Sequence, residues 1–114
     1  MRLPGRPRFA DVIRAQLDLY LEENADLLTR VAAAKQAYDR AKAPGAEEAY
    51  GVYMDAVEEA EDALLELRDR YAETMAARER GRYEREFSRA AERMLPTLQS
   101  RRLYMRAIDP DSTT

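Results

Sequence analysis

The chain has 114 residues, the size of one domain, and its 19 basic and 22 acidic side chains leave a net charge of −3. This balance excludes a surface that attracts polyanions over its whole extent. Neither cysteine nor histidine occurs, which excludes a disulfide framework, thiolate chemistry and histidine acting as a base or metal ligand. Because the sequence has no secretory signal and no apolar run of membrane-spanning length, we expect a cytoplasmic protein with no membrane contact and no cofactor.

Residues 1–7 are expected to form a basic flexible arm, because they contain two prolines and a glycine. A long helix is predicted over residues 8–42. Its apolar positions recur in alternating steps of three and four, the spacing that keeps one stripe of a helix against a partner. These positions, which we call the first seam, are Ile13, Leu17, Tyr20, Asn24, Leu27, Val31, Ala34, Tyr38 and Ala41.

A second long helix is predicted over residues 46–80, after a turn at Ala43-Pro44-Gly45. It carries a second seam, formed by Ala46, Tyr50, Tyr53, Val57, Ala60, Leu64, Leu67, Tyr71 and Thr74. The two helices are expected to form an antiparallel hairpin with Tyr38 near Tyr50 and Tyr20 near Leu67. The helix should end at Gly81, but a continuous helix stays an alternative because one interior glycine costs only about 1 kcal/mol.

A third helix is predicted over residues 82–108, with a kink at Pro96 because proline cannot donate a backbone hydrogen bond. Its apolar face carries Tyr83, Phe87, Ala90, Ala91, Met94 and Leu98. Residues 8–108 are therefore expected to form a single all-α domain, a helical bundle in which the third helix packs along the hairpin. Residues 109–114 are expected to be a disordered tail.

Two sides of the hairpin flank the seams. Leu21, Leu28, Met54 and Met75 lie on one side. The other side carries Ala49, Ala56 and Ala63, which we call the alanine strip; its small side chains permit close approach of another helix. One side can take the third helix and the other is left for a second subunit. We therefore predict a homo-oligomer, with a dimer favoured, or a complex with another helical protein.

Asn24 is the one strongly polar residue of the first seam, and the predicted register places it beside Leu64. A buried amide without partners costs about 1 to 3 kcal/mol. Asn24 therefore either specifies register or oligomeric state by meeting a further partner, or reaches solvent at a loosely packed layer.

Five arginines fall on one stripe of the third helical segment when it is wound at about 100° per residue, away from Tyr83 and Phe87. This arginine stripe consists of Arg78, Arg82, Arg85, Arg89 and Arg93. It is either a solvated face that neighbouring glutamates partly balance, or a docking surface for an acidic partner. Such a partner could be the acidic second helix of another copy or a nucleic-acid backbone.

No catalytic, cofactor-binding or metal-binding residue is predicted. Acidic residues crowd the second helix, but Asp55, Asp62 and Asp69 recur every seven residues opposite the seam, which is typical of a solvated face. The Glu-x-x-His motif of di-iron bundles is absent. We therefore expect a non-catalytic helical interaction or scaffolding protein that is not an enzyme. The alternative is a nucleic-acid-associated regulator that uses the basic arm and the arginine stripe.

Overall fold

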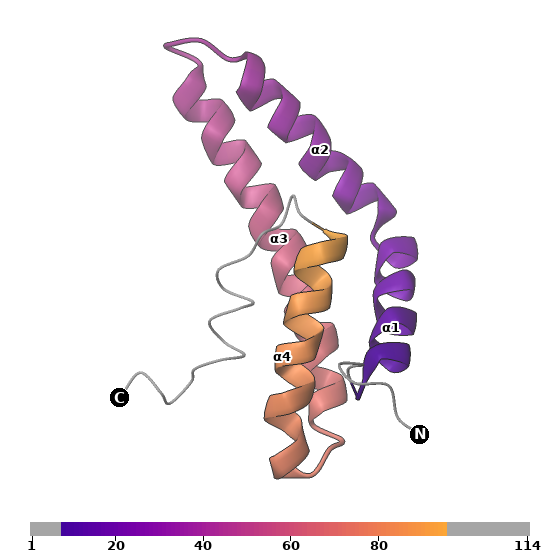
Figure 1. Cartoon of the computed structure of the whole chain (residues 1–114). Coiled ribbons are helices and arrows are strands. Elements are labelled where there is room, and N and C mark those ends of the chain that lie inside the picture. The colour runs from indigo at the N-terminus through magenta and orange to yellow at the C-terminus, as the bar shows by residue number, and fades with distance from the viewer. Residues whose placement is uncertain (1–7, 96–114) are drawn as a thin grey trace, which may run out of the picture.

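The computed structural model describes residues 8–95, which form four α-helices and no strand (Figure 1). The helices are α1 (Ala10–Glu23), α2 (Ala25–Arg40), α3 (Ala46–Ala72) and α4 (Ala77–Met94). The predicted all-α class is confirmed for this part of the chain. The expected arm at residues 1–7, the kink at Pro96 and the tail at residues 109–114 lie outside the described residues.

The predicted antiparallel hairpin is formed by α2 and α3, which are joined by a turn at residues 41–45 (Figure 1). Near the turn, the ring of Tyr38 lies 5.3 Å from that of Tyr50 and stacks at 6.2 Å on that of Tyr53. Further along the hairpin, Arg30 Nη2 forms an ion pair of 3.1 Å with Glu59 Oε2. The register predicted for the end of the hairpin that bears the turn is therefore confirmed.

The predicted continuous helix over residues 8–42 is wrong, because the chain leaves helical geometry at Asn24, between α1 and α2. The backbone of Asn24 has φ −116° and ψ 26°. Its N–H donates to the carbonyl of Tyr20 at 2.9 Å, and its side-chain Nδ2 donates to the same carbonyl at 3.0 Å. An asparagine side chain that bonds to the backbone competes with helix continuation, so α1 can end here and α2 can start in a new direction.

The change of direction at Asn24 alters the partners of α1. The expected neighbour of Tyr20 is Leu67, but the Tyr20 hydroxyl donates to the carbonyl of Ala60 at 2.8 Å, seven residues nearer the turn. The N-terminal end of α1 lies beside α4, and the two helices run in the same direction (Figure 1).

The boundary between α3 and α4 also differs from the prediction of a break at Gly81. The second helix ends at Ala72, not at residue 80, and the third begins at Ala77, not at residue 82. Arg80 explains the earlier stop, because its guanidinium donates to the carbonyls of Ala72 and Met75, both at 3.0 Å. The carbonyl of Ala72 also accepts a hydrogen bond from the backbone N–H of Met75 at 3.0 Å, so these bonds together hold the turn that ends α3. Gly81 lies inside α4, and the predicted extent to residue 108 lies partly outside the described residues.

The lower part of the molecule is a three-helix base made of α1, α4 and the second half of α3 (Figure 1). Tyr83 lies at its centre with no exposed surface. Its ring contacts those of Phe9, Tyr71 and Phe87 at centroid distances of 5.6, 5.2 and 5.9 Å. Its hydroxyl donates to Gln16 Oε1 at 2.7 Å. One residue of α4 thus joins all three helices of the base.

A carboxylate of α4 fastens the start of α1. The side chain of Glu86 accepts hydrogen bonds from the backbone N–H of Phe9 at 2.9 Å and of Arg8 at 3.3 Å. Such N–H groups at the start of a helix have no partner within it, and a negative charge there is favoured by the helix dipole. Arg82 Nε also donates to Glu86 at 3.1 Å, so this carboxylate accepts three hydrogen bonds.

Candidate functional site

The alanine strip follows α3 on the side that α4 leaves uncovered. Ala56 is buried, whereas Ala49 and Ala63 are half-buried. Arg68 bonds to a residue of α4. Ala63 precedes it by five residues, which places the two about 140° apart around the helix. The structure therefore has the two-sided arrangement that the sequence predicts, with α4 on one side of α3 and the alanine strip on the other.

A groove of about 460 Å³ lies beside the strip between α2 and α3. Ala33 and Ala34 line its α2 wall, and Val52 and Ala56 line its α3 wall. Val52 is 56% exposed, the highest value among the exposed large hydrophobic residues between residues 8 and 95. The lining also includes Asp55 and the ion pair between Arg30 and Glu59, so this concave face combines small side chains and an exposed valine with charged residues.

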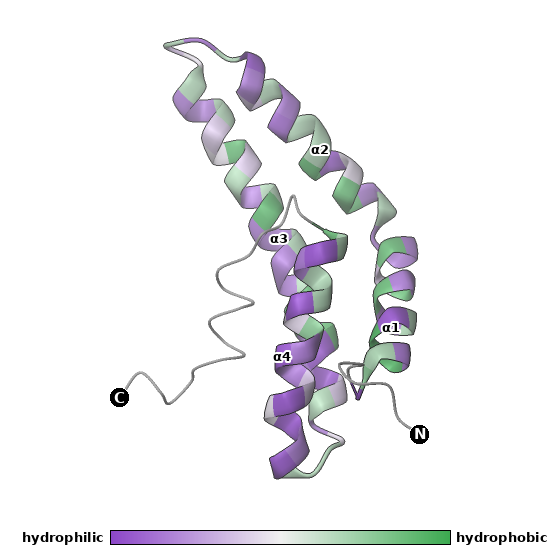
Figure 2. Ribbon diagram, in the orientation of Figure 1, coloured by the Kyte–Doolittle hydropathy of each residue, from purple (hydrophilic) through white to green (hydrophobic). Residues whose placement is uncertain are grey.

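The arginine stripe lies on the outer face of α4. All five of its members are exposed, as predicted. In Figure 2, much of the α4 ribbon has the colour of hydrophilic residues. Arg82 pairs with Glu86 at 3.1 Å. Within residues 8–95, the other four members of the stripe have no carboxylate partner: Arg78, Arg85, Arg89 and Arg93.

Asn24 lies apart from both surfaces, at the junction of α1 and α2. It is half-buried, and its side-chain amide is bonded to the carbonyl of Tyr20 within its own chain. The structure thus gives Asn24 a local role in ending α1. It does not bring Asn24 together with the alanine strip or the arginine stripe.

A buried polar cluster between α3 and α4 escaped the sequence analysis. The side chain of Arg68 is only 1% exposed, and its guanidinium donates to Asp69 Oδ1 at 3.0 Å and to Ser88 Oγ at 3.5 Å. Asp69, expected on a solvated face, is half-buried by this pairing. The signal was present in the spacing, because a second run in steps of four and three flanks the seam: Glu61, Leu65, Arg68 and Ala72, all of which are buried.

The hydroxyls of two core tyrosines resist ionisation. Burial, with a smaller contribution from the negative charge of Glu61, raises the pKa of Tyr20 to about 12. Burial also raises the pKa of Tyr83, against the opposing effect of its hydrogen bond to Gln16. The Tyr20 hydroxyl can donate to Ala60 only while it keeps its proton, so this contact between α1 and α3 depends on the neutral phenol.

We expect stability to fall in alkaline solution because of Tyr20. A tyrosine in the unfolded chain ionises at about pH 10, whereas folded Tyr20 ionises near pH 12. The stabilisation is complete below the lower value and is lost as the pH rises to the higher one. Urea unfolding at rising pH should show this loss, and Tyr20→Phe should make it shallower. An equally steep loss in the variant would contradict the assignment to Tyr20.

Between residues 8 and 95, no cluster of three or more acidic side chains is arranged so that it could hold a metal ion. In the same range, none of the helices combines the length and apolarity needed to cross a membrane. The acidic residues Asp55 and Asp62 are exposed, as expected for the outer face of α3.

These features define an all-α protein built from a two-helix hairpin on a three-helix base, with two exposed surfaces of different chemistry. Comparison with protein-family models, curated proteins and solved structures finds no match for the chain.

Proposed function

We propose that the protein is a non-catalytic, cytoplasmic interaction or scaffolding protein that forms a homodimer through the α2–α3 hairpin. The observation that carries this proposal is the groove beside Ala56. It exposes Val52 and Ala33, beside the buried Ala34 and Ala56, on a face of the hairpin that α4 does not cover. A helix from a second copy would remove this apolar surface from water and pack closely against the alanines.

Ala33→Glu tests the proposed dimer. Ala33 is exposed and lines the groove, so the new carboxylate is solvated in the monomer but would be buried in the dimer. We expect the dimer to dissociate at least tenfold more readily, a change of about 1.4 kcal/mol. Sedimentation equilibrium from micromolar to millimolar concentration measures this change.

Ala32→Glu is the matched control. Ala32 is also an exposed alanine of α2, but it does not line the groove and lies about 100° further around the helix. The same charge at this position should leave the association unchanged. A protein that stays monomeric over the whole concentration range, or equal weakening by both substitutions, would refute the proposed interface.

A second candidate function, as a nucleic-acid-associated regulator, rests on the arginine stripe. Its support is that four exposed guanidiniums lack a carboxylate partner within residues 8–95. Replacing Arg82, Arg85 and Arg89 together by alanine should lower the salt dependence of duplex DNA binding. We expect the slope of log K against log salt to fall by about two, because Arg82 already pairs with Glu86. Absence of binding at low salt would rule out this function.

A further inference from the structure

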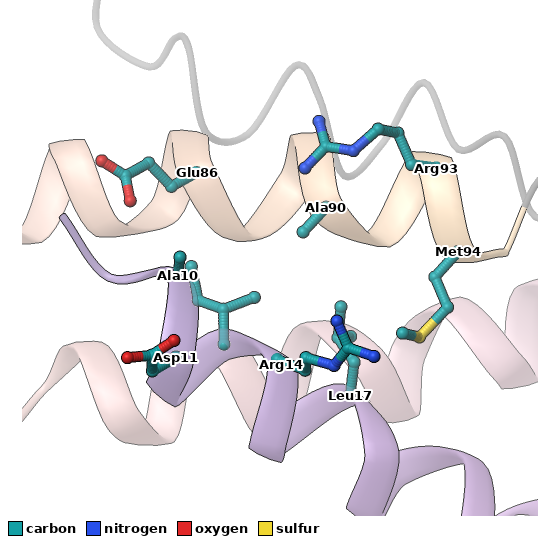
Figure 3. Close-up of a pocket in the computed structure, with 9 residues that line it drawn as sticks. Ala10, Asp11, Arg14, Leu17, Glu86, Ala90, Arg93 and Met94 are labelled. Atoms are coloured by element: carbon teal, nitrogen blue, oxygen red, sulfur yellow. The ribbon is translucent and has the colours of Figure 1, made fainter. Parts of the chain in front are cut away.

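A second groove, of about 420 Å³, lies between α1 and α4 (Figure 3). It belongs to the three-helix base and is separate from the groove beside the alanine strip, since the two share no lining residue. Its volume falls within the usual range for small-molecule sites, about 300 to 1,000 Å³.

The floor of this groove is apolar. Ile13 and Leu17 of α1 contribute side chains that are almost fully buried by the chain itself. Ala90 and Met94 of α4 line the other wall, and Met94 is 36% exposed. Because Ile13 and Leu17 expose almost no surface, a hydrocarbon chain in the groove would mainly cover the apolar surface that Met94 and Ala90 still expose.

Charge is distributed unevenly along the groove. Figure 3 shows Glu86 and Asp11 toward one end, and Arg14 and Arg93 nearer the other. The carboxylate of Glu86 is already engaged by the backbone N–H of Phe9 and by Arg82.

Unlike the carboxylate of Glu86, the two arginines of the groove are not engaged by groups of the chain itself within residues 8–95. Arg14 projects from α1 and Arg93 from α4, and both are exposed. Neither has a carboxylate partner within residues 8–95. Guanidiniums on opposite walls are well suited to hold one carboxylate, because each can donate two hydrogen bonds in a fixed plane.

We propose that the groove binds a free, single-chain carboxylate amphiphile. Its carboxylate lies between Arg14 and Arg93, and its hydrocarbon chain lies along Ala90 and Met94, above the buried side chains of Ile13 and Leu17. An acidic helix fits less well, because anions spaced along its length would meet Glu86 and Asp11 at the other end. A ligand with a single anionic group can place that group beside the two arginines and keep it away from the acidic end of the groove.

Titration of the full chain with dodecanoate, below its micelle concentration, tests the site. Methyl resonances of Ile13, Leu17, Ala90 and Met94 should shift and saturate together. Arg14→Gln and Arg93→Gln should each weaken binding about five- to tenfold, because each removes one charged donor. Arg85→Gln, at an exposed α4 arginine outside the groove, should leave the affinity unchanged.

Four outcomes would overturn the proposal. The first is an absence of methyl shifts with dodecanoate. The second is equal binding of dodecyltrimethylammonium, which has the same chain and the opposite charge. The third is equal weakening by Arg85→Gln. The fourth is a set of shifts at these methyls that grows with protein concentration alone, which would make a second copy the occupant of the groove.

Discussion

Replacing Tyr83 by alanine is expected to lower the free energy of unfolding by about 4 kcal/mol, the largest effect of any single change considered for this protein. The ring has no exposed surface and contacts Phe9, Tyr71 and Phe87. Its loss leaves a cavity at the one point where α1, α3 and α4 meet. For a domain whose total stability is about 5 to 15 kcal/mol, this change would remove between about a quarter and about four fifths of it.

Two further substitutions show how much of this loss of stability comes from the ring of Tyr83, from its hydroxyl and from its buried position. Tyr83→Phe keeps the ring but removes the bond to Gln16, so it should cost only about 1 kcal/mol. Tyr50→Ala removes a tyrosine that is 47% exposed, and should cost less than about 1 kcal/mol. Urea unfolding measures the change in the free energy of unfolding for all three variants. Similar losses for Tyr83→Ala and Tyr50→Ala would show that α4 does not depend on Tyr83 for its packing.

Replacing Arg68 by alanine is expected to cost about 3 to 4 kcal/mol of stability. The guanidinium is buried between α3 and α4, where it bonds to Asp69 and Ser88. Its removal leaves a cavity and takes away a buried guanidinium that bonds to both Asp69 and Ser88. Thermal and urea unfolding should show the loss, together with reduced packing of α4 on α3.

Arg70→Ala is the matched control for Arg68. Arg70 lies on the same helix and pairs with Glu66, but both side chains are about 70% exposed. A pair of this kind contributes about 0.5 kcal/mol or less. Arg68→Met, which keeps most of the volume and removes the charge, tests whether the loss comes from packing or from the polar bonds. Stability equal to the wild type in Arg68→Ala would refute a structural role for the cluster.

Much of the hairpin could be predicted because apolar spacing and turn residues agree. The Pro-Gly turn and the pairing of Tyr38 with Tyr50 both follow from the two seams. The break at Asn24 could not be placed, because the repeat continues through that residue in steps of three and four. What ends α1 is a side-chain bond to the carbonyl of Tyr20, and apolar periodicity contains no information about such bonds.

The start of α4 was misplaced for a similar reason. Gly81 looked like a helix break, but the break at residues 73–76 is held by Arg80, whose guanidinium reaches two carbonyls at the end of α3. A hydrogen bond from a long side chain to nearby backbone carbonyls produces no periodic pattern of apolar residues, so it cannot be predicted from such a pattern.

The candidate surfaces were predictable to different degrees. The alanine strip and the arginine stripe follow from helical spacing alone, and the structure places them on α3 and α4 as expected. Arg68 was missed because a charged residue is normally assigned to solvent. The groove between α1 and α4 was missed too, because Arg14 and Arg93 come together only after the chain turns at Asn24.

The turn at Asn24 gives the molecule two regions of unequal thickness. Below it in Figure 1, three helices share one core. Above it, α2 and the first half of α3 pack mainly against each other. Local opening requires only the free energy of the contacts that it breaks, so the two-helix end can fray and close while the base stays folded. On this argument, the proposed dimer interface lies at the end of the molecule that is expected to open more readily, whereas the groove between α1 and α4 lies in the base.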